Sequence, residues 1–410
     1  MSFVVVPHPI GMLPVAEVNA KIDKAFDDIV KAATEWKPSK ENAVKQAASY
    51  PARVFKFNGT YADVNKLFAS RKWSLGIPIV PPTVDKVAAM LKGTQRDPSE
   101  EIWVVPPRNG ILTVELVAVL GVMAGAQPEH MPLLLAMAEA MADPDSAWLG
   151  TSTTTAPTVP VVLVSGPVVE QLKLNSGTGT SGPLNDVTNA LGYFVNLVGD
   201  VVGGSVKPNI DKSTHGSPAD FVTHVYVENA KSNPWKTTLA EEEGFKNGES
   251  VVAIFGCYPG NGNIDHNNRT GKGLLTTFSL GSLATPAGIG SCFADASKPY
   301  TPANSVNKNL IVLCPEHAAT LYQDFKTVEE MQKFVVETAK MPFFFYSPDR
   351  CVPPKDMEVT RDTILPRWAN PKSIRFFVAG GPGKQSWIWG NFTMVPRIVA
   401  KEIKELPAAK

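Results

Sequence analysis

The sequence predicts an α/β fold with mixed, partly parallel sheets and helices on the faces of those sheets. Three observations lead to this class. Apolar runs of strand length recur along the chain, segments with helical spacing separate several of them, and 410 residues are enough for one large or two medium domains. The hydrophobic content of 44% and the charged content of 19% are those of an ordinary globular protein.

Residues 1–60 predict a helical arm followed by a linker. Between 15 and 35 the apolar residues Val18, Ile22 and Phe26 recur at helical spacing, and charged residues occupy the opposite face. Pro14 suits the first turn of such a helix, and Pro38 lies just beyond its expected end. We expect this arm to pack on the body of the protein or on a second subunit.

Residues 61–230 predict a first α/β lobe. A strand at 73–80 runs into Pro81-Pro82, and Thr83 suits the N-cap of the helix that follows, because its hydroxyl can accept a hydrogen bond from a first-turn amide. Apolar runs and helical spacing continue the alternation, with strands at 102–105, 159–165 and 221–228 and helices at 113–125, 132–142 and 187–202. The alternation favours strands that are at least partly parallel.

Residues 231–410 predict a second α/β lobe. The patterns give strands at 251–257, 310–314 and 374–379, a helix-like segment at 271–282 and a helix at 328–339. Charged and apolar residues from 395 onward predict a closing amphipathic helix.

Two short echoes indicate an internal duplication. The segment 127–130, Gln-Pro-Glu-His, resembles 314–317, Cys-Pro-Glu-His, and the apolar run 161–167 resembles 311–315. Two related lobes that meet at a cleft would explain both echoes.

Composition and charge exclude several classes of protein. Lys plus Arg and Asp plus Glu number 39 each, so the formal net charge is zero and no basic field is present to bind nucleic acid or anionic lipid. No apolar run reaches the about 18 residues of a membrane span, and the N-terminus does not resemble a secretory signal. The four cysteines form no C-x-x-C pair, which favours a reduced cytoplasm. We therefore expect no nucleic acid and no membrane as partners.

The strand end at 314 carries the first candidate for chemistry. His317 directly follows an apolar strand, and α/β sheets place functional side chains outside the carboxyl ends of their strands. It is a candidate general acid/base or ligand. Glu316 is a candidate for substrate binding, and its alternative role is to favour the N-terminus of a following helix.

A polar loop at 261–269 carries the second candidate. Asp265, His266 and Arg269 bring a carboxylate, an imidazole and a guanidinium together, a set that suits proton transfer and the binding of a substrate carboxylate. Lys272 is a second candidate for the substrate anion. A solvated hairpin tip has the same composition, so both interpretations stay open.

Four further sets complete the candidates. Glu115 is a second catalytic carboxylate, and Thr83 is a further substrate-binding residue. Cys292 follows a glycine-rich stretch and is a candidate nucleophile if a nearby positive group lowers its pKa. No metal signature of fixed spacing is present, although a divalent metal could be assembled from distant segments, with His215, His266 and His317 as its ligands.

Several of these segments resemble a known family, the large region of bacterial proteins linked to the UGSC-like group that contains selenocysteine or cysteine. The match covers most of residues 67–385. It is carried by the segments 76–83, 113–115, 122–125, 166–167, 233–235, 265–266, 273–277 and 315–318. Residues 8–11 and the helix after them look like the tail of the smaller UGSC-like domain.

The redox element of that smaller domain does not precede His8. Ile289-Gly290-Ser291-Cys292 matches three letters of U/C-G-S-C but lies in another region, and Ala126 stands where a cysteine is expected after Gly125. The resemblance implies an enzyme with redox or carbon–heteroatom lyase chemistry and does not name a substrate.

The leading hypothesis is an enzyme, soluble in the cytoplasm, that acts on a small polar or anionic molecule by His/Asp acid–base chemistry. A homo-oligomer or a redox partner subunit is the expected assembly. The alternatives are a non-catalytic subunit that docks a redox partner through residues 1–60, and a metal-dependent lyase or hydrolase.

Overall fold

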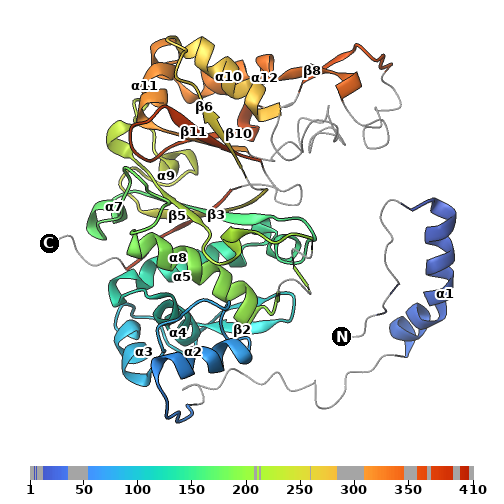
Figure 1. Ribbon diagram of the computed structural model, residues 1–410, viewed down its shortest axis with the longest axis vertical. Coiled ribbons are helices and arrows are strands. Elements are labelled where there is room, and N and C mark those ends of the chain that lie inside the picture. Colours follow the sequence, from blue (N-terminus) through green and yellow to red (C-terminus); the bar gives the residue numbers. More distant parts are fainter. Residues whose placement is uncertain are drawn as a thin grey trace. The chain divides into compact units, whose positions relative to one another are not determined.

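The computed structural model describes residues 4, 6, 13–35, 54–206, 210–211, 214–258, 260–283, 309–345, 358–366, 371–390 and 398–405. Contacts between residues divide the chain into two compact units, Met1–Ser49 and Tyr50–Lys410. The first unit contains α1 (Val15–Thr34), the predicted helix of the arm. The second unit contains the other elements and the candidate sites (Figure 1).

The second unit is built on two four-stranded mixed sheets. The first sheet has the order β12-β5-β3-β4, and the second has the order β10-β7-β11-β6. The strands of the first sheet are β3 (Val159–Ser165), β4 (His224–Val227), β5 (Val251–Cys257) and β12 (Val399–Glu402). Those of the second sheet are β6 (Asn261–Ile264), β7 (Asn309–Leu313), β10 (Ile374–Val378) and β11 (Gln385–Trp389). Two small antiparallel pairs join β1 (Glu101–Val105) to β2 (Gly110–Thr113) and β8 (Lys340–Pro342) to β9 (Ile364–Pro366).

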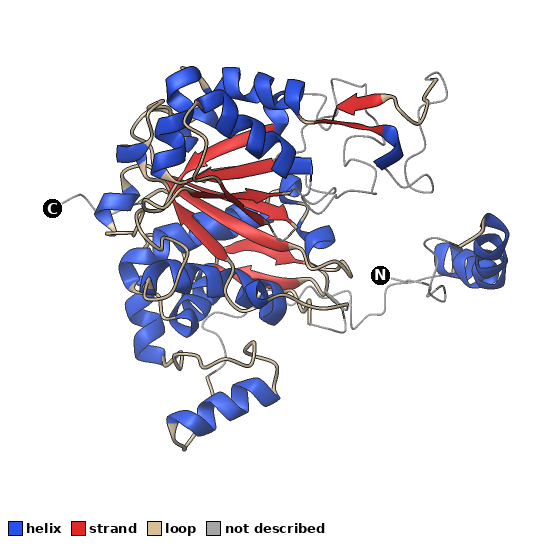
Figure 2. Cartoon of the chain, turned by 45° about the horizontal axis from the view of Figure 1, so that its top comes forward, coloured by secondary structure: helices blue, strands red, loops and turns tan. Residues whose placement is uncertain are grey.

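The two main sheets pack face to face between outer helices (Figure 2). Side chains alternate along each strand, so Leu163 of β3 and Val312 of β7 share the inner core, whereas Val164 and Leu313 point to the helices outside. On the outer side of the first sheet, α5 (Met131–Ala142) and α8 (Asp186–Leu197) lie against the strands, and α4 (Val114–Ala124) and then α3 (Val84–Leu91) pack behind them. The helices on the second sheet are α10 (Gly271–Leu283), α11 (Pro315–Asp324) and α12 (Val328–Thr338).

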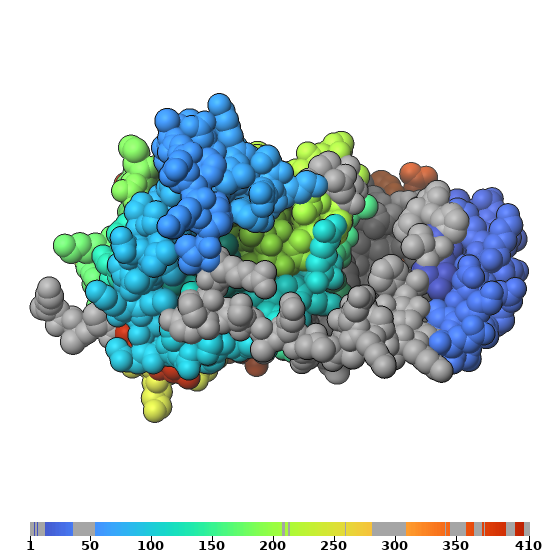
Figure 3. All heavy atoms as spheres, turned by 90° about the horizontal axis from the view of Figure 1, so that it is seen from below, coloured from blue at the N-terminus to red at the C-terminus, as the bar shows by residue number. Residues whose placement is uncertain are grey.

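Shorter elements connect these layers. The remaining α-helices are α2 (Tyr61–Ser70), α6 (Trp148–Thr151), α7 (Val168–Gln171) and α9 (Leu239–Glu242). The 3-10 helices are η1 (Pro128–His130), η2 (Pro144–Ser146), η4 (Pro218–Asp220), η5 (Ala230–Ser232), η6 (Phe343–Phe345) and η7 (Pro371–Ser373), and η3 (Val198–Val202) is a π-helix. On the face seen in Figure 3, residues 54–70 (blue) lie on the outside, and Val54 and Tyr61 are more than half exposed.

The two sheets repeat one topology and exchange their fourth strands. In each sheet a first strand pairs in parallel with the second and antiparallel with the third: β3 with β4 and β5, and β7 with β10 and β11. The chain then crosses over. β6 follows β5 but pairs with β11 in the second sheet, and β12 follows β11 but pairs with β5 in the first. Two related halves therefore complete one another.

Hydrogen bonds beyond the strands support this equivalence. The amide of Glu228 donates to the carbonyl of Val164 (2.9 Å), and the amide of Ala379 donates to that of Leu313 (3.0 Å), one step past β4 and β10 respectively. Glu228 and Ala379 also form an antiparallel bridge with each other. The carboxyl ends of the two parallel strand pairs thus meet at this point.

The α/β class and the mixed, partly parallel sheets are confirmed, and β3 and β5 have the bounds that their apolar runs predict. Local chemistry explains the ends of the helices. The hydroxyl of Thr113 accepts from the amide of Leu116 (3.2 Å) at the start of α4, and Gly125 ends that helix at φ 91°, a conformation that glycine adopts without strain.

Two predicted elements are wrong. Residues 73–80 form no strand, because prolines at 78, 81 and 82 lack the amide donors that a strand needs, and the Ile79 amide donates instead to Asn65 Oδ1 (2.8 Å). The segment predicted as a closing helix contains β12, whose residues complete the edge of the first sheet.

The predicted lobe boundary at 230 falls between β4 and β5, which belong to the same sheet. Among the helices that the structure describes, none is long and apolar enough to cross a membrane.

Candidate functional site

His317 lies in the first turn of α11, directly after β7, as the sequence predicts. It is buried, with 1% of its surface exposed. Its Nδ1 lies 2.8 Å from Ser386 Oγ of β11, and its Nε2 lies 3.1 Å from the carbonyl oxygen of Asp265. The edge of Phe278 from α10 packs against the ring. His317 thus ties α11 to β11 and to the loop after β6.

The hydrogen bonds assign the protons of this cluster. The Asp265 carbonyl can only accept, so His317 Nε2 donates to it, and the amide of Cys314 donates to Ser386 Oγ (3.2 Å). The Ser386 hydroxyl is then free to donate to Nδ1 of a neutral imidazole. Burial lowers the pKa of His317, but its interactions with Cys314 and Asp265 outweigh burial and hold the pKa above its usual value.

The Asp265 carboxylate organises its own loop. It accepts hydrogen bonds from the amides of Asn267 (3.1 Å) and Asn268 (2.9 Å), from Asn268 Nδ2 (2.5 Å) and from Thr277 Oγ1 (2.8 Å). Burial raises the pKa of Asp265, but these four hydrogen bonds outweigh it and lower the pKa to about 2. The carboxylate therefore fixes the turn that leads from β6 into α10.

Replacing Asp265 by asparagine is expected to lower the free energy of unfolding by about 2 kcal/mol at neutral pH. The pKa is depressed in the folded state, so the stabilisation is present above the ordinary pKa of 3.8 and is lost as the pH falls toward 2. Urea unfolding would measure the free energy of unfolding of wild type and variant, and the difference between them should be smaller at acidic pH than at neutral pH. The neighbouring change His266→Asn is the control, and an equal loss in both variants would contradict the assignment.

The other candidate residues in and after the predicted loop face solvent. His266, Arg269 and Lys272 are exposed, and the amide of Lys272 donates to Asp324 Oδ2 (2.8 Å), which ties the start of α10 to α11. The structure therefore brings Asp265 to His317 through a backbone carbonyl and leaves the His266 side chain outside this cluster.

Glu316 holds the glycine-rich turn after β10. Its Oε2 accepts from the amides of Lys384 (2.8 Å) and Gly383 (2.5 Å), and these hydrogen bonds lower the pKa of its carboxyl. The carboxylate joins the start of α11 to this turn.

Thr83 and Glu115 lie with the helices that cover the first sheet, away from the His317 cluster. Thr83 is the N-cap residue of α3, as predicted, but its exposed side chain makes no capping hydrogen bond. Glu115 is half-buried in the first turn of α4. The structure does not bring either residue to Asp265 and His317.

Two further predictions concern a thiol and a metal. Cys292 lies outside the described residues. Within the described ranges, no group of three or more histidine, cysteine, aspartate or glutamate side chains is placed to hold a metal ion, so His215, His266 and His317 do not form such a group. The reason is their placement, because His215 and His266 are exposed and both ring nitrogens of His317 already have partners.

Glu228 is a buried carboxylate that the sequence patterns did not predict as a site residue. It follows β4 at the point where the two parallel strand pairs meet, and 4% of its surface is exposed. Its Oε1 accepts from the amide of Leu239 (3.1 Å), the first residue of α9, and its Oε2 accepts a short hydrogen bond from Ser165 Oγ at the end of β3. The available signal was a carboxylate directly after an alternating strand, where α/β folds place functional groups.

Burial is the main reason that the pKa of Glu228 is raised, to about 7. The hydrogen bonds from Ser165 and Leu239 oppose the shift, and the charge of Glu241 adds to it. A carboxyl group with this pKa can give up or accept a proton near neutral pH.

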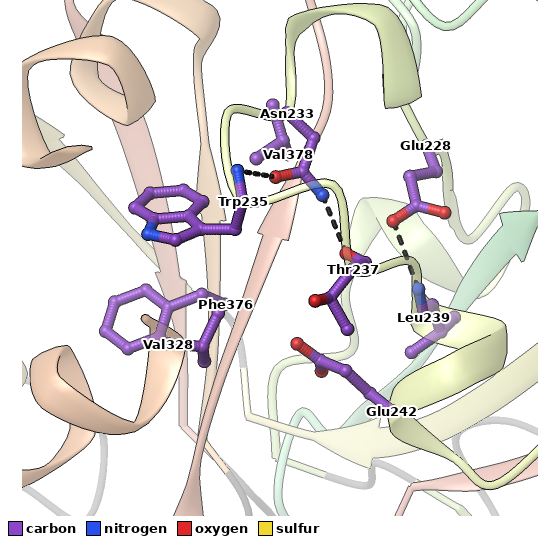
Figure 4. Close-up of a pocket in the computed structure, with 9 residues that line it drawn as sticks. All are labelled: Glu228, Asn233, Trp235, Thr237, Leu239, Glu242, Val328, Phe376 and Val378. Atoms are coloured by element: carbon purple, nitrogen blue, oxygen red, sulfur yellow. Dashed lines mark hydrogen bonds between the residues drawn. The ribbon is translucent and has the colours of Figure 1, made fainter. Parts of the chain in front are cut away.

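Glu228 lines a small pocket between the loop after β4, α9, β10 and the start of α12 (Figure 4). The other lining residues are Asn233, Trp235, Thr237, Leu239, Glu242, Val328, Phe376 and Val378. Asn233 shapes the loop, because its Nδ2 donates to the Thr237 carbonyl (2.8 Å) and its Oδ1 accepts from the Trp235 amide (3.1 Å). Trp235 Nε1 donates to the carbonyl of Phe325 (3.1 Å), which holds the indole against the second sheet's helices.

A buried ion-pair cluster supports one wall of this pocket. Arg375 of β10 donates through its two terminal nitrogens to Glu242 and to Glu243, at the end of α9. All three side chains are at least 88% buried, since 8%, 12% and 10% of their surfaces are exposed. The cluster fixes the position of the Glu242 carboxylate.

The chain matches no protein-family model, no curated protein and no solved structure.

Proposed function

We propose that the protein is an enzyme that acts on a small polar molecule by acid–base chemistry, with Glu228 as the group that transfers the proton. The observation that carries this proposal is a buried carboxyl whose pKa is raised to about 7 and that lines a pocket. Asn233, Thr237 and Glu242 supply polar groups that can orient a substrate beside it, and Trp235 and Phe376 supply apolar walls.

Proton abstraction of the kind that starts an elimination suits this arrangement. An ionised Glu228 would take a proton from the substrate, and the Ser165 hydroxyl would stabilise the carboxylate before the transfer. The carbon–heteroatom lyase that the resemblance to UGSC-like proteins implies is therefore the reaction class that we propose. The relation to UGSC-like proteins and the homo-oligomer or redox partner remain predictions.

Replacing Glu228 by glutamine is expected to lower kcat/KM about 100-fold or more, because glutamine keeps the shape of the side chain but cannot exchange a proton. A panel of small polar substrates would be followed by NMR for product formation, with wild type and variant compared. In the wild type the rate should follow a group with a pKa of about 7. Glu170→Gln, an exposed carboxylate on α7, is the matched control. Unchanged turnover in the Glu228 variant would contradict the proposal.

The same substitution is expected to change how stability depends on pH. The pKa of Glu228 in the folded state is raised above the ordinary 4.5. The contribution of this group to the free energy of unfolding is therefore fully present below pH 4.5, and about 3 kcal/mol is lost as the pH rises through 7. The glutamine variant should lack this loss. Thermal or urea unfolding across this range measures it, and parallel curves for the two proteins would show that Glu228 does not titrate near neutrality.

A second candidate function is thiol chemistry at Cys314. Cys314 is the N-cap residue of α11, where backbone amides favour a thiolate. Burial raises its pKa, but the electrostatic influence of His317 and the backbone amides of His317 and Gln385 outweigh burial, and the net pKa lies below its usual value. These features support the redox-related part of the sequence prediction.

Cys314 is expected to react with iodoacetamide faster than Cys257, whose burial holds the pKa of its thiol well above the usual value. Mass spectrometry of the folded protein after timed alkylation would give a rate for each cysteine. The change His317→Gln should slow the reaction of Cys314 and leave that of Cys257 unchanged. Equal rates for the two cysteines would exclude an activated thiol at position 314.

A further inference from the structure

We propose that the pocket beside Glu228 binds the primary ammonium group of a small amine, placed between the carboxyl groups of Glu228 and Glu242 and the rings of Trp235 and Phe376. The inference rests on the proposed function, since it names the class of substrate for the same pocket. It follows from the charge, the walls and the size of the pocket.

The charge around the pocket is negative. Among the nine described residues that line it, two are carboxyl groups and none is basic. Glu241 and Glu243 add two more carboxyl groups at α9, and the nearby guanidinium of Arg375 is already bound to Glu242 and Glu243. Lys231 of η5 pairs with Glu170 at 2.8 Å and is 85% exposed. A cation would therefore be attracted to the pocket, and an anion would be repelled.

The walls of the pocket suit a cation with an organic stem. The rings of Trp235 and Phe376 lie on one side, and the carboxyl groups of Glu228 and Glu242 lie on the other (Figure 4). The face of an aromatic ring attracts an ammonium group, and tryptophan does so best. The hydrogen bond from Trp235 Nε1 to Phe325 fixes the indole before a ligand binds.

The size of the pocket limits the head group. Its free space has room for a group of about one water molecule's size. A primary ammonium is of this size and offers three N–H donors, which match the oxygens of Glu228, Glu242 and Thr237. A quaternary ammonium is larger and has no N–H donor.

Binding should be coupled to the ionisation of Glu228. With a pKa of about 7, part of the Glu228 population is protonated at neutral pH, and an ammonium group favours the carboxylate form. The charge of Glu241 on α9 opposes that ionisation, and the Ser165 hydroxyl and the Leu239 amide favour it. The guanidinium of Arg375 on β10 is bound to Glu242 and Glu243. A bound amine would therefore displace a proton from the pocket.

Calorimetry on the full chain with three probes tests the proposal. Methylammonium has the positive charge and a head group small enough for the pocket. Methanol has a small head group without the charge, and tetramethylammonium has the charge on a head group that is too large. We expect measurable binding of methylammonium alone, tightening as the pH rises through about 7, with proton release that changes the heat between buffers of different ionisation enthalpy. Glu228→Gln should weaken binding about tenfold, a difference of about 1.4 kcal/mol, and remove the pH dependence.

The possible results separate this inference from the proposed function. No binding of methylammonium, or equal binding of methanol or tetramethylammonium, would overturn the inference, even if Glu228 proved essential for turnover of a neutral substrate. Selective binding of methylammonium that Glu228→Gln weakens would support the inference even if no turnover were found. The variant Trp235→Leu supplies a second measurement, provided that its melting temperature is unchanged. Loss of the indole ring should weaken methylammonium binding and leave the pH dependence of that binding in place.

Discussion

Replacing Arg375 by methionine is expected to lower the free energy of unfolding by about 3–5 kcal/mol, because it removes the partner of two buried carboxylates. Arg375 pairs in register with Leu310, whose side chain belongs to the inner core, so water has little access to the site. Methionine fills most of the space but removes the positive charge that lies against the carboxylates of Glu242 and Glu243.

Chemical denaturation measures this loss, and two variants test its cause. Changing Glu242 and Glu243 to glutamine in the Arg375→Met background should restore much of the stability, since the two side chains that lost the guanidinium are then uncharged. The exposed pair of Lys231 and Glu170 is the matched control, and Lys231→Met should change stability by less than about 0.5 kcal/mol. A loss below about 1 kcal/mol for Arg375→Met would mean that the ion pairs are not maintained in solution.

Ending the chain before Ile398 is expected to prevent folding of the second unit. β12 is the edge strand of the first sheet, and Ile398, Val399 and Ile403 are buried. Its removal would expose these core contacts and leave one edge of β5 unpaired, while the other edge keeps its pairing with β3.

Circular dichroism and amide exchange of the shortened chain would show the effect. A chain that ends after Glu405 keeps the contacts described here, including the pairing of Lys401 with Asp143 at 2.7 Å, and serves as the control. A cooperative unfolding transition in the chain that ends before Ile398 would show that β12 is dispensable. Adding a peptide of residues 398–405 should recover part of the structure, since the strand is bound by backbone hydrogen bonds.

Four of the strands that the sequence predicts are buried on both faces. β3, β5, β7 and β10 lie between the inner core and outer helices, and so their residues are almost continuously apolar. β6 is Asn-Gly-Asn-Ile and β12 is Val-Ala-Lys-Glu, and neither is distinguishable from a loop or a helix end by periodicity. Their strand conformation comes from pairing with β11 and β5, which is tertiary information.

The candidate site shows the same division. The position of His317 outside a strand end was predictable, because a buried strand and a helix follow one another in the sequence. Its partners Ser386 and Asp265 were not, since they arrive from β11 and from the loop after β6. Glu228 is a carboxylate after an alternating strand in the sequence, and only the contacts with Ser165 and Leu239 distinguish it from a solvated strand end.

The exchange of β6 and β12 between the sheets affects how the protein can form during synthesis. A ribosome releases β3, β4 and β5 early, yet β12, the fourth strand of their sheet, is synthesised only after the strands of the second sheet. The nascent chain must therefore hold β5 with an unpaired edge until β12 has been synthesised. We expect that edge to bind a chaperone or a second nascent chain during this time, so that misassembly would take the form of strand exchange between two copies.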